Sequence, residues 1–213
     1  MGGTLIATLL GPWAAAIAIS VALLIQAVLF GDGGILAFGA NCFNMAFVIP
    51  FLGYFVYRFI KERSRGKTGE YVGLAIGSYI ALNAAALFAS IEFGLQPALF
   101  KDAAGMPMYC PYPLAVSVPA MMIPHLLVAG IVEAAFTVAI FAFIPRVSPG
   151  TIHEGSPRKT RPLLALLVAL IALSPLGLLA SGTAWGEWGA DEISGVVHGG
   201  QALGFTPTGM QGG

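Results

Sequence analysis

The stretch Leu23–Phe51, LLIQAVLFGDGGILAFGANCFNMAFVIPF, decides the fold because it joins two apolar runs through a turn of glycines. An apolar run of about 20 residues is long enough to cross a bilayer as a helix. The GDGG segment at residues 31–34 interrupts the runs, because glycine adopts backbone angles that other residues avoid. The stretch therefore predicts a membrane hairpin of two helices, with Asp32, Asn41 and Asn44 near its turn.

The composition of the whole chain supports this prediction. Of 213 residues, 57% are hydrophobic and 9% are charged, and the mean hydropathy is +0.85. A soluble domain carries roughly 25% charged residues. We therefore expect an all-α fold, a polytopic transmembrane helical bundle. The formal net charge is zero, which excludes a general attraction to nucleic acid, and the first residues lack the charged start of a cleavable signal.

About five full spans and a partial helix at the N-terminus are expected from the apolar runs. The runs are Pro12–Phe30, Gly39–Ile60, Tyr71–Phe93, Leu114–Ile144 and Pro162–Ala180. Pro119 and Pro124 must kink the fourth run or divide it into a short leading helix and a span. A proline-rich loop that begins near Pro97 precedes it. Residues 1–161 then form the membrane core, and residues 162–213 form the final transmembrane helix and an outward tail rich in Gly and Trp.

The first run, Gly2–Leu10, is only about half a bilayer long at 1.5 Å per residue. It is either a short interfacial helix or the end of a helix whose beginning is missing. Its length favours the second interpretation, which is a chain truncated at its N-terminus.

The basic residues predict which end of each span lies in the cytoplasm. Nine of the ten fall within Arg58–Lys67 and Arg146–Arg161, and only Lys101 lies elsewhere. Two spans separate these connectors, so both lie on one side of the membrane, which the positive-inside rule makes cytoplasmic. The glycine turn, the proline-rich loop and the tail then face outward.

Polar side chains inside the spans are costly, and they mark either helix contacts or function. Asn41 and Asn44 are three residues apart, so they share a face of an α-helix and form a polar floor under the glycine turn. They either bond neighbouring helices or serve a site in the outer half of the membrane. The complete set is Gln26, Asn41, Asn44, Asn83, Glu92, His125 and Glu133.

His125 and Glu133 raise the question of a metal or proton site, but their spacing argues against a direct pair. Eight residues separate them by about 12 Å along a helix, and the HExxH pattern of a helical zinc site is absent. His125 follows a proline, so it can bond a carbonyl that the kink frees. Glu133 lies among small residues, so we expect its carboxyl group to be either paired with another group or protonated. An intramembrane enzyme that uses these two residues is the alternative function from a different class.

Small residues recur every four positions in the first full span, at Ala14, Ala18 and Ala22. Such a stripe lets helices approach closely, either inside the chain or at a docking face for a partner subunit.

Cys42 and Cys110 are too few for a metal cluster or a disulfide framework, so we expect them to be packing residues. The chain has no complete Gly-rich phosphate loop, so it does not hydrolyse ATP by that route.

Four segments of the chain carry a family pattern. They are LLGPWAA (Leu9–Ala15), QAVLFGDGGILAFGANCFNM (Gln26–Met45), PHLLVAGIVEAAFT (Pro124–Thr137) and GTAWGEWG (Gly182–Gly189). Together they resemble the CbiM/NikM family, the substrate-binding (S) membrane subunits of cobalt and nickel energy-coupling factor (ECF) transporters. The resemblance covers nearly the whole chain, and the second segment is highly specific.

The resemblance implies a subunit, not an enzyme, that captures Co²⁺ or Ni²⁺ on the outer side of a prokaryotic inner membrane and carries no bound cofactor. The metal would supply cobalamin synthesis or a nickel enzyme. The implied partners are a transmembrane coupling subunit (CbiQ/NikQ-like), ATPase subunits (CbiO/NikO-like) and a small accessory membrane subunit (CbiN/NikN-like). Imidazole and amine nitrogens suit both metals.

The metal ligands of the family cannot be placed on this sequence. They come from an amino-terminal Met-His pair and from a histidine shortly before the LLGPW helix, whereas this chain begins with MGGT at residues 1–4. As written, the chain should bind metal poorly or not at all, and a structural remnant that assembles without transport is a further alternative. Asp32, Asn41, Asn44 and His125 are expected to support the outer site by orienting ligands through hydrogen bonds.

Overall fold

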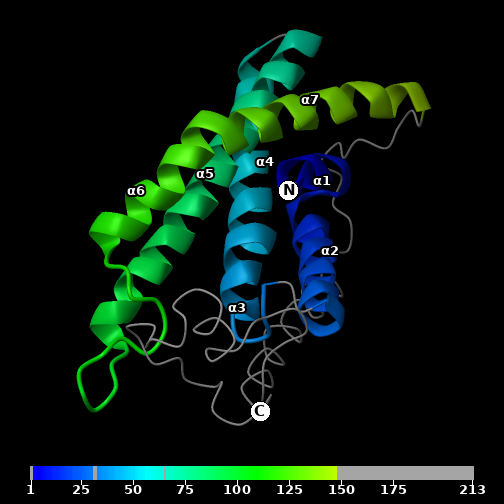
Figure 1. The fold of residues 1–213 in the computed structure, drawn as a ribbon. Coiled ribbons are helices and arrows are strands. Elements are labelled where there is room, and N and C mark those ends of the chain that lie inside the picture. The colour runs from blue at the N-terminus through cyan, green and yellow to red at the C-terminus, as the bar shows by residue number, and fades with distance from the viewer. Residues whose placement is uncertain (1, 31–32, 65, 148–213) are drawn as a thin grey trace.

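The computed structural model describes residues 2–30, 33–64 and 66–147, and within them the chain is helical (Figure 1). The α-helices are α1 (Gly3–Leu10), α2 (Pro12–Ile25), α3 (Phe38–Asn41), α4 (Ile49–Arg63), α5 (Lys67–Leu99), α6 (Leu114–Pro124) and α7 (Gly130–Val147). Three π-helical segments extend or join them, namely η1 (Gln26–Phe30), η2 (Cys42–Val48) and η3 (His125–Ala129). The described part has one isolated β-bridge, between Lys101 and Pro107. The predicted all-α fold is confirmed.

Within the described residues, four helices are long and apolar enough to cross a membrane. They are Pro12–Leu29, Phe38–Arg63, Lys67–Leu99 and Leu114–Ile144. Each coincides with one of the first four predicted spans, and the second and third extend beyond the predicted bounds. The fifth predicted span, Pro162–Ala180, and the proposed tail lie outside the described residues, as does most of the connector Arg146–Arg161.

Helix α5 is longer than the predicted run Tyr71–Phe93 at both ends. At its start, Glu70 lies in the first turn, where a carboxylate interacts favourably with the helix dipole. At its end, Pro97 lies inside the helix, so the prediction of a loop that begins there is wrong. The reason is that proline costs a helix one N–H bond, and here the loss falls in the last turn, where Phe100 N–H still donates to Gln96 O at 2.8 Å.

The fourth span bends at Pro124 but stays continuous from Leu114 to Ile144, so the kink is the one of the two predicted outcomes that occurs. After Pro124 the backbone becomes the π-helix η3, and Gly130 N–H donates to His125 O, five residues back. A proline demands such a change, because it has no N–H and its ring displaces the carbonyl four residues before it. α6 and α7 meet there at a bend (Figure 1). The interruption expected at Pro119 is wrong, since α6 continues through that residue.

Glycines set the distance between α4 and α5, the two helices at the centre of the bundle. A Cβ atom at Gly77 would lie 2.7 Å from Gly53 O, and one at Gly73 would lie 2.9 Å from Tyr57 O. Both positions require glycine because backbone atoms of the partner helix occupy the space of a side chain. Gly69 is four residues before Gly73 and is also buried, so Gly69, Gly73 and Gly77 form a stripe of small residues at intervals of four. The sequence analysis singled out alanines of the first span and missed this stripe.

Helix α1 has eight residues, which confirms that the first run is short, while its interpretation as the end of a longer helix stays a prediction. Its Leu5 belongs to a buried apolar cluster with Tyr57, Leu74 and Phe141. These four side chains come from α1, α4, α5 and α7. The start of the described chain is therefore packed into the same core as the central helices.

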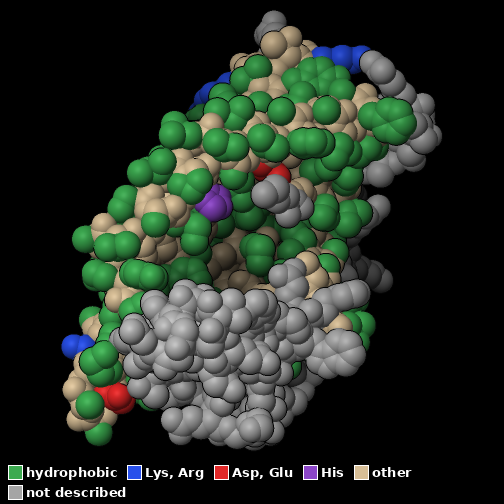
Figure 2. Space-filling model, viewed as in Figure 1, with side chains coloured by type: hydrophobic (Ala, Val, Ile, Leu, Met, Phe, Trp, Pro, Cys, Tyr) green, Lys and Arg blue, Asp and Glu red, His purple; other side chains and the backbone are tan. Residues whose placement is uncertain are grey.

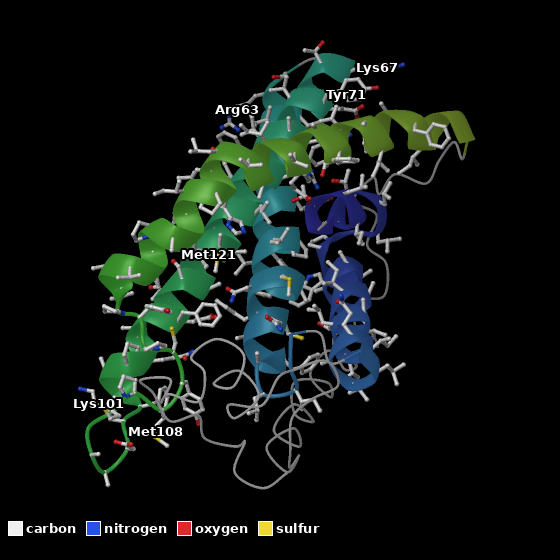
Figure 3. All side chains as sticks on the ribbon, in the orientation of Figure 1. Arg63, Lys67, Tyr71, Lys101, Met108 and Met121 are labelled. Carbon is white, nitrogen blue, oxygen red and sulfur yellow. The ribbon has the colours of Figure 1, made fainter. Side chains whose placement is uncertain are left out.

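Charged side chains gather at one end of the α4–α5 pair. Figure 3 places Arg63 and Lys67 at this end and Lys101 at the opposite end. Lys61 Nζ lies 2.7 Å from Glu70 Oε1, and this ion pair joins α4 to α5 across the short turn between them. The arrangement agrees with the predicted sidedness, in which the basic connector is cytoplasmic and the loop around Lys101 is outside.

We predict that Gly77→Val destabilises the protein, because the new side chain would overlap the α4 backbone. Overpacking of this kind costs about 1–3 kcal/mol. Ile76→Val is the matched control, since Ile76 is exposed on the same turn of α5. Thermal unfolding in detergent micelles should show a clear decrease in Tm for the first variant alone, and equal Tm values would contradict the packing described for these helices.

Candidate functional site

One face of the bundle is hollowed below α7, between α6 on one side and α2 on the other (Figures 1 and 2). A histidine side chain stands on one rim of this space, and an acidic side chain stands on its upper rim (Figure 2). This space is termed the central hollow. The polar residues that the sequence singles out lie on the helices around it, and each takes a specific partner.

Asn44 holds a carboxyl group in the half of the bundle away from the α4–α5 turn. It lies in η2 and is 6% exposed, and its Nδ2 donates to Glu92 Oε2 of α5 at 2.8 Å. Within the described residues, its Oδ1 is buried and has no hydrogen-bond partner. The amide therefore ties two helices together through one of its polar atoms and leaves an acceptor free beside the carboxyl group.

Asn41 has a different partner, although the sequence predicts that it shares a face with Asn44. Its Nδ2 donates to Gly33 O at 3.3 Å, so it closes the glycine turn. Gly33 has φ +78°, and a Cβ atom there would lie 2.6 Å from Asn41 Nδ2, which explains the glycine. Asn41 is the last residue of α3 and Asn44 lies in η2, and the two amides bond different neighbours, the glycine turn and α5. Asp32 lies outside the described residues.

His125 and Glu133 are not bonded to one another within the described part of the chain, as their spacing predicts. His125 Nδ1 lies 2.8 Å from Met121 O, a carbonyl that also accepts from the backbone N–H of His125. The expected bond to a carbonyl freed by the kink is therefore not the one that forms, since Pro124 frees the carbonyl four residues before it, that of Ala120. Glu133 is 4% exposed, and its Oε1 accepts from Gly2 N at 2.7 Å, which confirms a paired carboxyl. Each residue thus has a separate partner, and the geometry gives no support to a catalytic pair.

A second polar contact supports the π-helical segment η3, and the sequence analysis missed one of its residues. Tyr79 OH donates to Leu126 O at 3.0 Å, so that α5 satisfies a carbonyl of the irregular segment. Asn83, one turn later, donates through Nδ2 to Tyr79 O at 2.8 Å, and its Oδ1 is buried without a partner in the described residues. Tyr79 could have been found from its hydroxyl group, which lies inside a predicted span four residues before Asn83.

The described residues contain no group of three or more His, Cys, Asp or Glu side chains that could hold a metal ion. A cavity of about 340 Å³ lies between α5, α6 and the loop before α6, but its lining is mostly apolar. Cys110 contributes to it, and both Cys110 and Cys42 are free thiols of intermediate burial. With one thiol, this cavity lacks the set of several donor atoms that a metal centre needs.

The alanine stripe of the first full span faces outward from the described bundle. Ala18 and Ala22 are exposed and Ala14 is partly exposed, so the described helices do not cover them. Gln26, at the start of η1, is exposed as well. A docking role for this stripe stays a prediction.

Comparisons with known proteins identify relatives over most of the chain. Residues 1–151 match the family described as "CbiM: Cobalt uptake substrate-specific transmembrane region". The chain is 55% identical over 194 residues to the probable fused nickel transport protein LarMN of Lactiplantibacillus plantarum, which covers 91% of this chain and 58% of the relative. It is 50% identical over 193 residues to the fused nickel transport protein NikMN of Rhodobacter capsulatus, with 88% and 56% covered. The chain thus spans a little over half the length of these relatives.

A solved structure has a similar fold. A crystal structure of a truncated transition metal transporter superposes with a TM-score of 0.65 and shares 54% sequence identity, over 68% of this chain and 67% of that chain. At this identity the likeness reflects common ancestry as well as a common arrangement of helices.

We predict that Asn44 and Glu92 are energetically coupled. A hydrogen bond to a charged group contributes about 1.5–3 kcal/mol in soluble proteins, whereas interhelical bonds in membranes average about 0.6 kcal/mol. A double-mutant cycle with Asn44→Ala and Glu92→Ala, followed by unfolding in detergent, should therefore give a coupling of about 1 kcal/mol. Strict additivity of the two substitutions would contradict the bond. Asn41→Ala with Glu92→Ala is the control pair, and it should be additive.

Proposed function

This chain belongs to the CbiM family, and we propose from that premise that it is the membrane subunit of an uptake system for Ni²⁺ or Co²⁺. The cation would be captured on the outer side and released to the cytoplasm, to feed cobalamin synthesis or a nickel enzyme. The proposed location is the inner membrane of a prokaryote, with the basic connectors in the cytoplasm. Family membership supports transport and not catalysis.

The observation that carries this proposal is the identity of 55% with a nickel transport protein across 91% of the chain. A match of 194 residues within 213 necessarily includes the three spans from Phe38 to Ile144, and it runs past residue 151, where the family region ends. The shared sequence therefore includes η2, α5 and η3, which carry the polar contacts around the central hollow.

We infer that the subunit works with partners that supply energy. The sequence contains no complete phosphate-binding loop, so ATP hydrolysis by that route belongs to other chains. The proposed partners are a transmembrane coupling subunit of the CbiQ/NikQ type, ATPases of the CbiO/NikO type and a small accessory subunit of the CbiN/NikN type. The names of two relatives describe fused proteins, which supports a close association with an accessory part.

The polar contacts suit a supporting role in such a subunit. Asn41 fixes the glycine turn through Gly33 O, and Asn44 fixes Glu92. Groups that hold ligands or loops in one orientation commonly change metal affinity about 10–100-fold when they are removed. We propose that Asp32, Asn41, Asn44 and His125 shape the outer side of the central hollow in this way.

The direct test is metal uptake. A host that lacks its own nickel and cobalt uptake should accumulate radioactive Ni²⁺ or Co²⁺ when it expresses this chain with the coupling subunit and the ATPases. The control host expresses the partners alone. Equal accumulation in the two hosts, with the chain present in the membrane, would refute the proposed function.

We predict that Asn41→Ala lowers uptake in the same assay by about tenfold, because the glycine turn loses the amide that closes it. Ala40→Ser, at an exposed position of α3, is the matched control and should leave uptake unchanged. Uptake by the Asn41→Ala host at the level of the parent would remove this role from the amide.

A further inference from the structure

The hydrogen bond of His125 determines which of its two ring nitrogens is available. Met121 O is a carbonyl oxygen and can only accept, so Nδ1 must carry the proton in the contact of 2.8 Å. In the neutral imidazole, Nε2 then has a free lone pair. Within the described residues, no hydrogen-bond partner of Nε2 is found, so this nitrogen is available as a metal ligand.

We propose that His125 Nε2 binds the transported divalent cation as it passes the middle of the membrane. This inference rests on the proposed function and gives His125, proposed there as a supporting group, the role of a direct nitrogen ligand on the helix break between α6 and α7. Histidines that bind metals typically donate their second ring N–H to a carbonyl or carboxylate, which fixes the tautomer and the ring orientation. His125 already has this arrangement through Met121 O.

The local backbone holds the ring in place. His125 is the first residue of η3, directly after Pro124, and its own N–H donates to carbonyls of the preceding turn. Tyr79 OH of α5 bonds the next carbonyl along the chain, Leu126 O, at 3.0 Å. The segment is therefore irregular, but these hydrogen bonds hold it in place. π-helical segments are frequently found at functional sites.

The surroundings offer space at the ring and a polar side chain beside its backbone. Figure 2 shows a histidine side chain at the rim of the central hollow, with an acidic side chain on the upper rim of the same space. Asn83 Oδ1 is a buried acceptor without a partner in the described residues. A Cβ atom at Gly130 would lie 2.6 Å from Asn83 Nδ2 and 2.8 Å from His125 O, so the amide and the histidine backbone meet at this glycine.

A site with a single imidazole suits brief binding of an ion during transport better than tight binding. Imidazole nitrogen is a good ligand for Ni²⁺ and Co²⁺. One imidazole, with water in the remaining positions, gives a weak and exchangeable site, and the described residues contain no cluster that would close it into a cage. Passage through a membrane protein requires binding that is favourable enough for the ion to enter and weak enough for it to leave.

The alternative is that His125 only holds the Met121 carbonyl, and two substitutions separate the roles. His125→Asn places an amide N–H near the position of Nδ1, so it keeps the bond to Met121 O and removes the Nε2 lone pair. His125→Ala removes both. A structural role predicts that asparagine restores function, whereas a ligand role predicts that asparagine fails as alanine does.

The experiment measures uptake and the metal environment on the complete chain. Radioactive Ni²⁺ uptake with partner subunits should decrease by about tenfold or more for both His125→Asn and His125→Ala. The purified chain, loaded with Ni²⁺ in detergent, should show imidazole scattering in X-ray absorption spectra, and His125→Asn should lose it while its Tm stays near that of the parent. His153→Asn and His198→Asn are the matched controls and should retain the signal.

The outcomes distinguish this inference from the proposed function. If the parent chain accumulates metal and His125→Asn does so within twofold of it, the ligand role is refuted while the transport function stands. Retention of imidazole scattering in His125→Asn would likewise refute it, since another histidine would then be the ligand. If the parent chain neither accumulates metal with its partners nor shows imidazole scattering, both the function and the ligand role fall.

Discussion

The bilayer core supplies no water, so every backbone N–H and C=O in the spans must find its partner within the protein. This constraint explains why the break at Pro124 stays helical. At Pro124 the helix becomes the π-helix η3, and Gly130 N–H takes a carbonyl five residues back. Tyr79 OH then satisfies Leu126 O from a neighbouring helix. A loop at this depth would leave several groups unpaired, whereas a change of helical winding leaves almost none.

The same constraint explains why the polar side chains form hydrogen bonds between helices. Asn44 bonds Glu92 across 48 residues of sequence, and Glu133 accepts from Gly2 across 131 residues. These contacts connect η2 with α5, and α7 with the start of α1. Glycines bring α4 and α5 close enough for backbone contact, so that a few polar bonds can act between helices held at a fixed distance. The bundle is thus organised by small residues and by single, specific amides and carboxyls.

Weak polar features around an open space suit a protein that must release what it binds. The described residues hold no cluster of metal-binding side chains, and the polar atoms that lack partners are isolated oxygens such as those of Asn44 and Asn83. An ion that met a complete cage at mid-membrane would be held there. The isolated oxygens are compatible with the proposed transport role, and the family to which the chain belongs is described by cobalt uptake.

The sequence by itself determined the helical class, the first four spans, the expected sidedness and the residues at which polarity enters the membrane. It did so because length, hydropathy and the distribution of Lys and Arg are local quantities. Only the tertiary structure decided which groups these residues bond to or pack against. Asn41 and Asn44 were expected on one face, and the structure gives them different partners, the carbonyl of Gly33 and the carboxyl of Glu92. Pro97 lies within a helix because its lost bond falls in the last turn, and Gly77 is required by a carbonyl of another helix. Such choices depend on the rotation and distance of neighbouring helices, which no local pattern encodes.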